Sequence, residues 1–209
     1  MRDTRYENGF TLAELLIALI VTGIILAAVA TLAYALGTAN ESGDDTAVKQ
    51  AQVRYTTLRI SELIRHSKLV CGTADNDLAI WRADDNDNGE INPKELVYLE
   101  AGENRDYLQL LDFPSADDWL VQLSNIQDGT TKASLLLICD GRRTVLVPEC
   151  SNVQFGFDVL PPQSRFVSIS FDLVENGVVR QYQISAALRG WAGNLLDPAG
   201  DSLVTGDDD

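Results

Sequence analysis

Histidine and paired cysteines are nearly absent from this 209-residue chain. His66 is the only histidine, so a multi-histidine zinc site or a histidine-based catalytic triad within this chain is excluded. The cysteines Cys71, Cys139 and Cys150 form no Cys-x-x-Cys pair, which argues against a zinc or redox motif. They allow one disulfide with one thiol left over, and the sequence does not choose among the three pairings. The chain also lacks Gly-x-Ser-x-Gly, a phosphate-binding loop and a dinucleotide fingerprint, so we expect no enzymatic activity.

Basic side chains are also scarce. The chain has 16 Lys and Arg against 31 Asp and Glu, which gives a formal net charge of −15. Nonspecific binding to nucleic acid requires Lys and Arg to neutralise phosphates, so we expect no nucleic-acid partner. An acidic surface suits cations or a basic patch on a protein partner.

Charge is almost missing from one long apolar run, residues 10–36, whose single charged residue is Glu14. A carboxylate inside a membrane-length apolar helix is costly and is usually retained for a function. A helix over this run would rise roughly 40 Å at about 1.5 Å per residue, enough to span a bilayer. Arg2 and Arg5 precede the run and three acidic residues follow it within 41–45, which favours a cytoplasmic amino terminus.

The Gly9-Phe10 junction followed by Glu14 resembles the amino-terminal signature of type IV prepilins and type II secretion pseudopilins. In that family a short polar leader ends in Gly, the mature chain begins with Phe, and the fifth mature residue is Glu. The resemblance implies a leader of residues 1–9, cleavage after Gly9, and methylation of the Phe10 amine by the prepilin peptidase. A glycine at the cleaved bond suits this step, since it has no side chain to block the peptidase.

The resemblance also implies that Glu14 serves assembly. An ammonium and a carboxylate attract strongly in a low dielectric, but burying either one alone is costly. We therefore expect Glu14 of one subunit to meet the Phe10 amine of a neighbour as helices bundle. Major pilins often have Pro near mature position twenty-two, which here is Thr31, and residues 10–36 contain no Pro at all. This departure favours a minor, tip-located subunit.

The remaining pattern predicts an α+β, pilin-like fold: the long amino-terminal transmembrane and packing helix, then an antiparallel β-sheet domain. Polar residues 37–45 include two glycines and predict a break, after which 46–68 are helical again. The expected strands are 78–81, 96–99, 107–112, 119–123, 135–139, 144–147, 153–159, 166–174 and 178–187. Asp140-Gly141 and Asn176-Gly177 predict hairpin turns. The domain would span 37–192, followed by an acidic tail of 193–209.

An acidic loop over residues 84–95, DDNDNGEINPKE, fits the calcium-loop pattern D-x-[DN]-x-[DN]-G-x5-E without a gap. Calcium takes six to eight oxygen ligands at about 2.3–2.6 Å. The predicted ligands are the side chains of Asp84, Asn86 and Asn88, the backbone carbonyl of Glu90, Asn92 directly or through water, and both carboxylate oxygens of Glu95. Only two of the side chains are charged, which predicts weak, structural binding in an EF-hand-like loop within a sheet protein. The alternative is a solvated Asx-rich turn.

The late stretch with Pro161-Pro162 and the Asn176-Gly177 hairpin resembles J-type minor pseudopilins and the related PilW-type minor pilins. The first hypothesis is therefore a J-type subunit at the pseudopilus tip of a type II secretion system. It would cross the bacterial inner membrane once, with a periplasmic domain, and work with the peptidase, other minor pseudopilins and the inner-membrane assembly platform. The alternatives are a minor type IV or DNA-uptake pilin, and a membrane-anchored calcium-dependent binding module.

Overall fold

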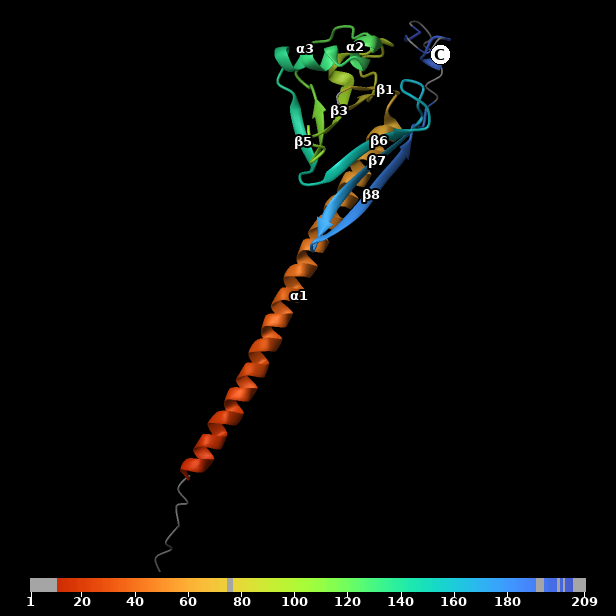
Figure 1. Cartoon of the computed structure of the whole chain (residues 1–209). Helices are drawn as coiled ribbons and strands as arrows, with labels where there is room; N and C mark the ends of the chain where they lie inside the picture. Colours follow the sequence, from red (N-terminus) through yellow and green to blue (C-terminus); the bar gives the residue numbers. More distant parts are fainter. Residues whose placement is uncertain (1–10, 75–76, 191–193, 199, 201, 205–209) are drawn as a thin grey trace, which may run out of the picture. The chain divides into compact units, whose positions relative to one another are not determined.

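The computed structural model describes residues 11–74, 77–190, 194–198, 200 and 202–204 (Figure 1). The chain divides into two compact units, one ending at Ala47 and the other beginning at Val48. The first helix, α1, runs over Leu12–His66 and so contributes to both units. The confirmed part of the fold expectation is a long apolar amino-terminal helix followed by antiparallel sheets.

The first unit consists of the apolar part of α1. Residues Leu12–Ala39 form a helical segment long and apolar enough to cross a membrane, and none of it is buried. At about 1.5 Å per residue its 28 residues are about 42 Å long, against about 30 Å for a bilayer hydrocarbon core. An exposed helix of this length whose side chains are predominantly apolar requires lipid or other helices around it.

The expected break over residues 37–45 is wrong, because α1 is helical throughout this stretch. Gly37 and Gly43 each cost only about 1 kcal/mol in a helix interior. Helix propagation is cooperative once a nucleus exists, and strong helical segments flank the stretch on both sides. A polar, glycine-containing stretch without proline therefore continues the helix.

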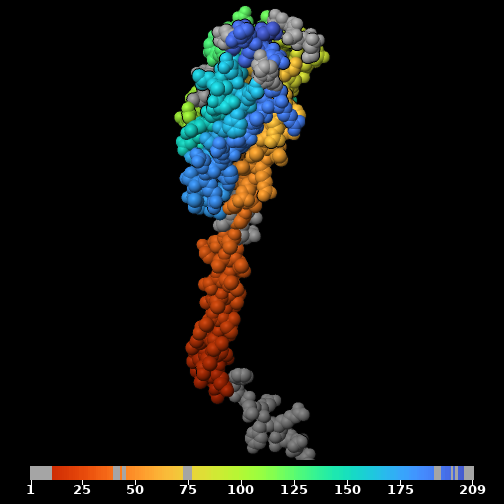
Figure 2. Space-filling model, turned by 90° about the vertical axis from the view of Figure 1, so that its right-hand side faces the viewer, coloured from red at the N-terminus to blue at the C-terminus, as the bar shows by residue number. Residues whose placement is uncertain are grey.

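The second unit contains two antiparallel sheets (Figure 1). The larger has the order β1-β2-β3-β4-β5, with β1 Leu69–Ala74, β2 Asp77–Trp81, β3 Leu96–Ala101, β4 Leu108–Asp112 and β5 Arg142–Val147. The smaller has the order β6-β7-β8, with β6 Ser151–Phe157, β7 Phe166–Glu175 and β8 Val178–Ala187. Figure 2 shows β7 and β8, in blue, lying along the orange second half of α1.

The two faces of the larger sheet carry separate cores, because side chains alternate along each strand. On one face Ile80 and Leu99 pack with Ile60 and Ile64 of α1 and with the smaller sheet. On the other face Trp81, among others, packs with two short helices, α2 Leu123–Gln127 and α3 Thr130–Ile138, and with the loops beside them. This second face holds both the acidic loop and the cavity considered below.

Two expected strands are wrong. Residues 119–122 form no strand and 123 begins α2, while 135–138 belong to α3. The apolar run at 135–138 has one buried residue, Leu135, whereas Leu137 is 88% exposed, so it is a helix turn with one inward face. Periodicity does not separate a short apolar strand from a buried helical turn. Asp140-Gly141 consequently joins α3 to β5 and is not a hairpin turn.

The hairpin between β7 and β8 is confirmed. Asn176 and Gly177 have φ values of 51° and 76°, and positive φ at both central residues is what a type I′ turn requires. The short connection fixes the register of the ten residue pairs between β7 and β8, from Phe166 opposite Ala187 to Glu175 opposite Val178.

Candidate assembly segment and cation-binding loop

The expected processing residues Gly9 and Phe10 lie outside the described residues, so their roles stay predictions. Helix α1 begins directly after Thr11, and Glu14 is its third residue. The carboxylate Oε2 of Glu14 accepts hydrogen bonds from the backbone N–H and the hydroxyl of Thr11, both at 2.9 Å. The backbone N–H of Glu14 donates in return to Thr11 Oγ1 at 3.3 Å.

Thr11 and Glu14 thus form a capping box, in which the first and fourth residues satisfy each other's backbone N–H groups. The pattern Thr-x-x-Glu before an apolar run is the sequence signal that indicates this arrangement. The hydrogen bonds hold the Glu14 carboxylate at the amino-terminal end of α1. An exposed carboxylate in that position is available to a cationic group.

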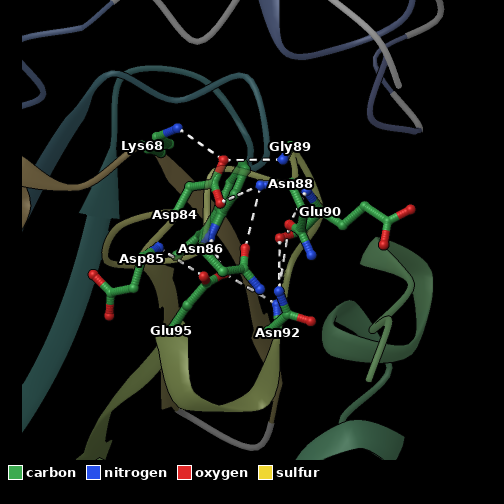
Figure 3. A network of polar contacts seen from close by, with 10 residues as sticks. Lys68, Asp84, Asp85, Asn86, Asn88, Gly89, Glu90, Asn92 and Glu95 are labelled. Carbon is green, nitrogen blue, oxygen red and sulfur yellow. Dashed lines mark hydrogen bonds and ion pairs between the residues drawn. The ribbon is translucent and has the colours of Figure 1, made fainter. Parts of the chain in front are cut away.

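The acidic loop lies between β2 and β3, as predicted, and closes on a 3₁₀ turn, Pro93–Glu95 (Figure 3). Asp84 accepts from the backbone N–H groups of Asn88, at 3.1 Å, and Gly89, at 3.0 Å. Asn86 Oδ1 accepts from the N–H of Asn88 at 3.2 Å. Asn88 Oδ1 accepts from the N–H of Glu90 at 2.8 Å. The alternate residues expected as ligands therefore turn their oxygens toward the inside of the loop.

Glu95 closes the far side of this loop and is 2% exposed. Its Oε1 accepts from the backbone N–H of Asp85 at 2.8 Å, and its Oε2 from the indole Nε1 of Trp81 at 3.0 Å and the N–H of Asn92 at 3.2 Å. The expected capping pair of Asn92 and Glu95 is present. Buried donors thus hold the Glu95 carboxylate in place.

The two other acidic side chains labelled in the loop point away from it. Figure 3 shows the carboxylate of Asp85 directed outward, where it pairs with Arg82, and that of Glu90 directed away from the loop oxygens. The outward side chain of Glu90 fits the prediction that only its backbone carbonyl is a ligand. Asn92 turns its Nδ2, at 3.4 Å, toward both Asn88 Oδ1 and the Glu90 carbonyl, so its amide would have to rotate to offer oxygen.

A cation from outside the loop also reaches it. Lys68 Nζ lies 3.2 Å from Asp84 Oδ2 and 5.4 Å from the centroid of the Trp81 ring. Partial burial would raise the pKa of the Asp84 carboxyl, but the hydrogen bonds from Lys68, Gly89 and Asn88 outweigh it and lower the pKa. Asp84 is therefore ionised at neutral pH, as a calcium ligand must be.

The described residues contain no cluster of three or more His, Cys, Asp or Glu side chains able to hold a metal. The predicted ligand set includes only two such side chains, Asp84 and Glu95, and otherwise consists of amides and a carbonyl. Cys71, Cys139 and Cys150 are all free thiols. Burial raises the pKa of Cys71 to about 12, which removes it as a nucleophile.

The comparisons with known proteins address the amino-terminal segment. Residues 4–30 match the family described as the prokaryotic N-terminal methylation motif. Neither the curated proteins nor the solved structures give a match to the chain. The matched segment contains the Gly9-Phe10 junction, Glu14 and most of the apolar run, so this chain carries an N-terminal methylation motif of the kind found in type IV pilins and pseudopilins.

Proposed function

We propose that this protein is a minor pseudopilin of the J type, a structural subunit at the pseudopilus tip of a type II secretion system. The observation that carries the proposal is the methylation motif at 4–30, which leads directly into an exposed apolar helix of membrane-spanning length. The absence of Pro from residues 10–36 supports a minor subunit. The prepilin peptidase would cut after Gly9 and methylate Phe10, and the domain would lie in the periplasm.

Assembly would depend on Glu14. The capping box holds its carboxylate at the start of α1, on an exposed surface. In a bilayer that charge is costly until a cation reaches it, and the methylated Phe10 amine of a neighbouring subunit is the cation that assembly would bring. Each subunit would then be more stable beside another subunit than alone in lipid.

The test is co-purification of the full-length chain with the other minor pseudopilins after co-expression with the peptidase. Glu14→Ala should abolish co-purification, while Glu103→Ala, which removes an exposed carboxylate in the second unit, should leave it intact. Equal recovery of both variants would contradict the role of Glu14. Recovery with minor type IV pilins alone would identify the protein as a minor pilin of a pilus or DNA-uptake fibre. That alternative function is supported by the same methylation motif.

A second proposal concerns the loop 84–95, which would hold one structural calcium ion through Asp84, Asn86, Asn88, Glu90, Asn92 and Glu95. Three observations support it: the gapless motif, the inward oxygens and the buried Glu95. The acidic residues of this loop repel one another. The ion would take the place of the N–H donors that now hold the carboxylates. Calorimetric titration of the detergent-solubilised full chain should show saturable uptake, and no uptake at millimolar calcium would exclude the site.

A further inference from the structure

A cavity of about 210 Å³ lies in the second unit between the larger sheet and α3, away from the acidic loop and from the assembly segment. Asp77, Ala79 and Tyr98 line its sheet side, and Ile126, Gly129, Lys132, Ala133 and Leu136 line its helix side. The wall is therefore mainly apolar, with three polar groups. None of the functions proposed above uses these groups.

The hydroxyl of Tyr98 has no hydrogen-bond partner among the described residues, although the residue is only 2% exposed. A buried hydroxyl without a partner costs about 1–3 kcal/mol, so it marks a position where a partner is expected. Tyr98 is held edge-on against Phe113, with ring centroids 6.2 Å apart, which fixes its orientation in the cavity wall. The ring is thus placed by packing, and its polar end is left for another molecule.

The charge beside the cavity is acidic. Asp77 and Glu100 are opposite each other in the β2–β3 register and both are buried. The ammonium of Lys132 contacts Asp77 directly and lies 2.6 Å from Glu100 Oε1. The guanidinium of Arg143 is half-exposed and lies farther away, with its Nε 4.0 Å from Glu100 Oε2. One partly buried ammonium, which also lies 6.0 Å from the centroid of the Tyr98 ring, is thus shared by two buried carboxylates, and the only other cation paired with them among the described residues is the half-exposed Arg143.

We propose that this cavity binds an alkylammonium group, whose N–H donors reach Tyr98 Oη and Asp77 while its apolar stem lies against Ile126, Ala133 and Leu136. An anion would meet two buried carboxylates, and a neutral alcohol would bring no charge to Asp77, which shares the Lys132 ammonium with Glu100. Burial raises the pKa of Asp77 to about 6 despite its contact with Lys132. The net charge of −15 would raise the local concentration of cations.

This chemistry has two sources, a free amine and a lysine side chain of a partner protein. The test uses the full chain in neutral detergent micelles at pH 7.5, titrated calorimetrically with n-pentylammonium chloride and, as a matched neutral probe, 1-pentanol. A second arm compares an acetylated, amidated pentapeptide with one central lysine against the same peptide with norleucine. We expect saturable binding of n-pentylammonium and no binding of 1-pentanol. If the lysine peptide also binds, the ligand is a lysine side chain of a partner protein. If it does not bind, the ligand is a free amine.

Two variants assign any binding to the cavity. Tyr98→Phe removes one hydroxyl that has no hydrogen-bond partner among the described residues, so the fold should be kept. Affinity for n-pentylammonium should fall about tenfold, as expected for a hydrogen bond to a charged group. Asp77→Asn should abolish binding, and Glu103→Gln, on the exposed surface, should not change it. Equal binding of the alcohol, no binding of either probe, or an unchanged affinity in Tyr98→Phe would overturn the proposal and leave a cavity that holds water only.

Discussion

Asp77 shows how one buried carboxylate couples stability to pH. Its ordinary pKa of 3.8 is raised to about 6, because burial outweighs the contact with Lys132. Between about pH 4 and pH 6 the folded protein therefore binds more protons at this residue than the unfolded chain does. The contribution of Asp77 to the free energy of unfolding must then fall as pH rises through this range.

The matched measurement is urea unfolding of the wild type and of Asp77→Asn at several pH values from 4 to 7. Because other carboxylates, such as Asp84, have lowered pKa values with the opposite effect, the difference between the two proteins isolates Asp77. We expect the wild type to lose stability relative to the variant as pH rises from 4 to 6. Parallel stability curves would show that the raised pKa is wrong.

Asp84 and Asp85 form a matched pair for the loop, since they are adjacent and of equal charge but point in opposite directions (Figure 3). Asp84→Asn should weaken calcium binding at least about tenfold, because it removes one of only two charged ligands. Asp85→Asn should change affinity by less than about threefold, as expected for an outward charge paired with Arg82. Calorimetric titration of the two full-length variants measures both values, and equal losses would mean that the loop attracts calcium by charge alone.

At the level of single residues, the sequence predicted what depends on local spacing and missed what depends on distant contacts. The inward loop oxygens and the capping pair of Asn92 and Glu95 follow from spacing within the twelve residues of the motif at 84–95. Lys68 and Trp81 reach the loop from 16 and 14 residues away in the chain, and no local pattern indicates such contacts. The cavity groups Asp77, Tyr98 and Lys132 come from two strands and a helix, which only the fold brings together.

Among the elements, α1 is the one whose continuity matters most for an assembly subunit. Gly43 lies inside the helix, and a Cβ added there would meet no other atom within 4 Å. Gly43→Ala should therefore raise helix stability by about 1 kcal/mol, whereas Gly43→Pro should cost about 3 kcal/mol by removing a hydrogen bond and clashing with the preceding turn.

Circular dichroism and co-purification test these two variants in the full chain. The proline variant should lose helical signal and recovery of partner pilins, and the alanine variant should retain both. If the proline variant matches the wild type in helical signal, residues 37–45 are not helical in solution.

Strands β6, β7 and β8 were predicted well, whereas β1 and the short helices were not, for a physical reason. Strands β6, β7 and β8 have alternating patterns and clear turn signals, so residues 153–187 were predicted almost within their observed bounds. Helix α3 has nine residues and its apolar residues are consecutive, so it has little periodicity to distinguish it from a strand. Its helical state is decided by packing of Leu135 onto the sheet, which is a tertiary effect.

For the whole molecule, the two units differ in where their apolar side chains lie. The span 12–39 exposes its apolar side chains, which is unfavourable in water, while the second unit buries its apolar side chains in two cores. The α+β order was predictable from the change in period after residue 68. The two separate cores were not, because they depend on which strand faces pack against α1.

Leader cleavage and methylation can be measured as the intact mass of the protein purified from cells that contain a prepilin peptidase. We expect the mass of residues 10–209 plus one methyl group, with the methyl on Phe10 in the amino-terminal peptide. An unprocessed chain, or cleavage at another bond, would contradict a pilin-like role and favour a membrane-anchored binding module.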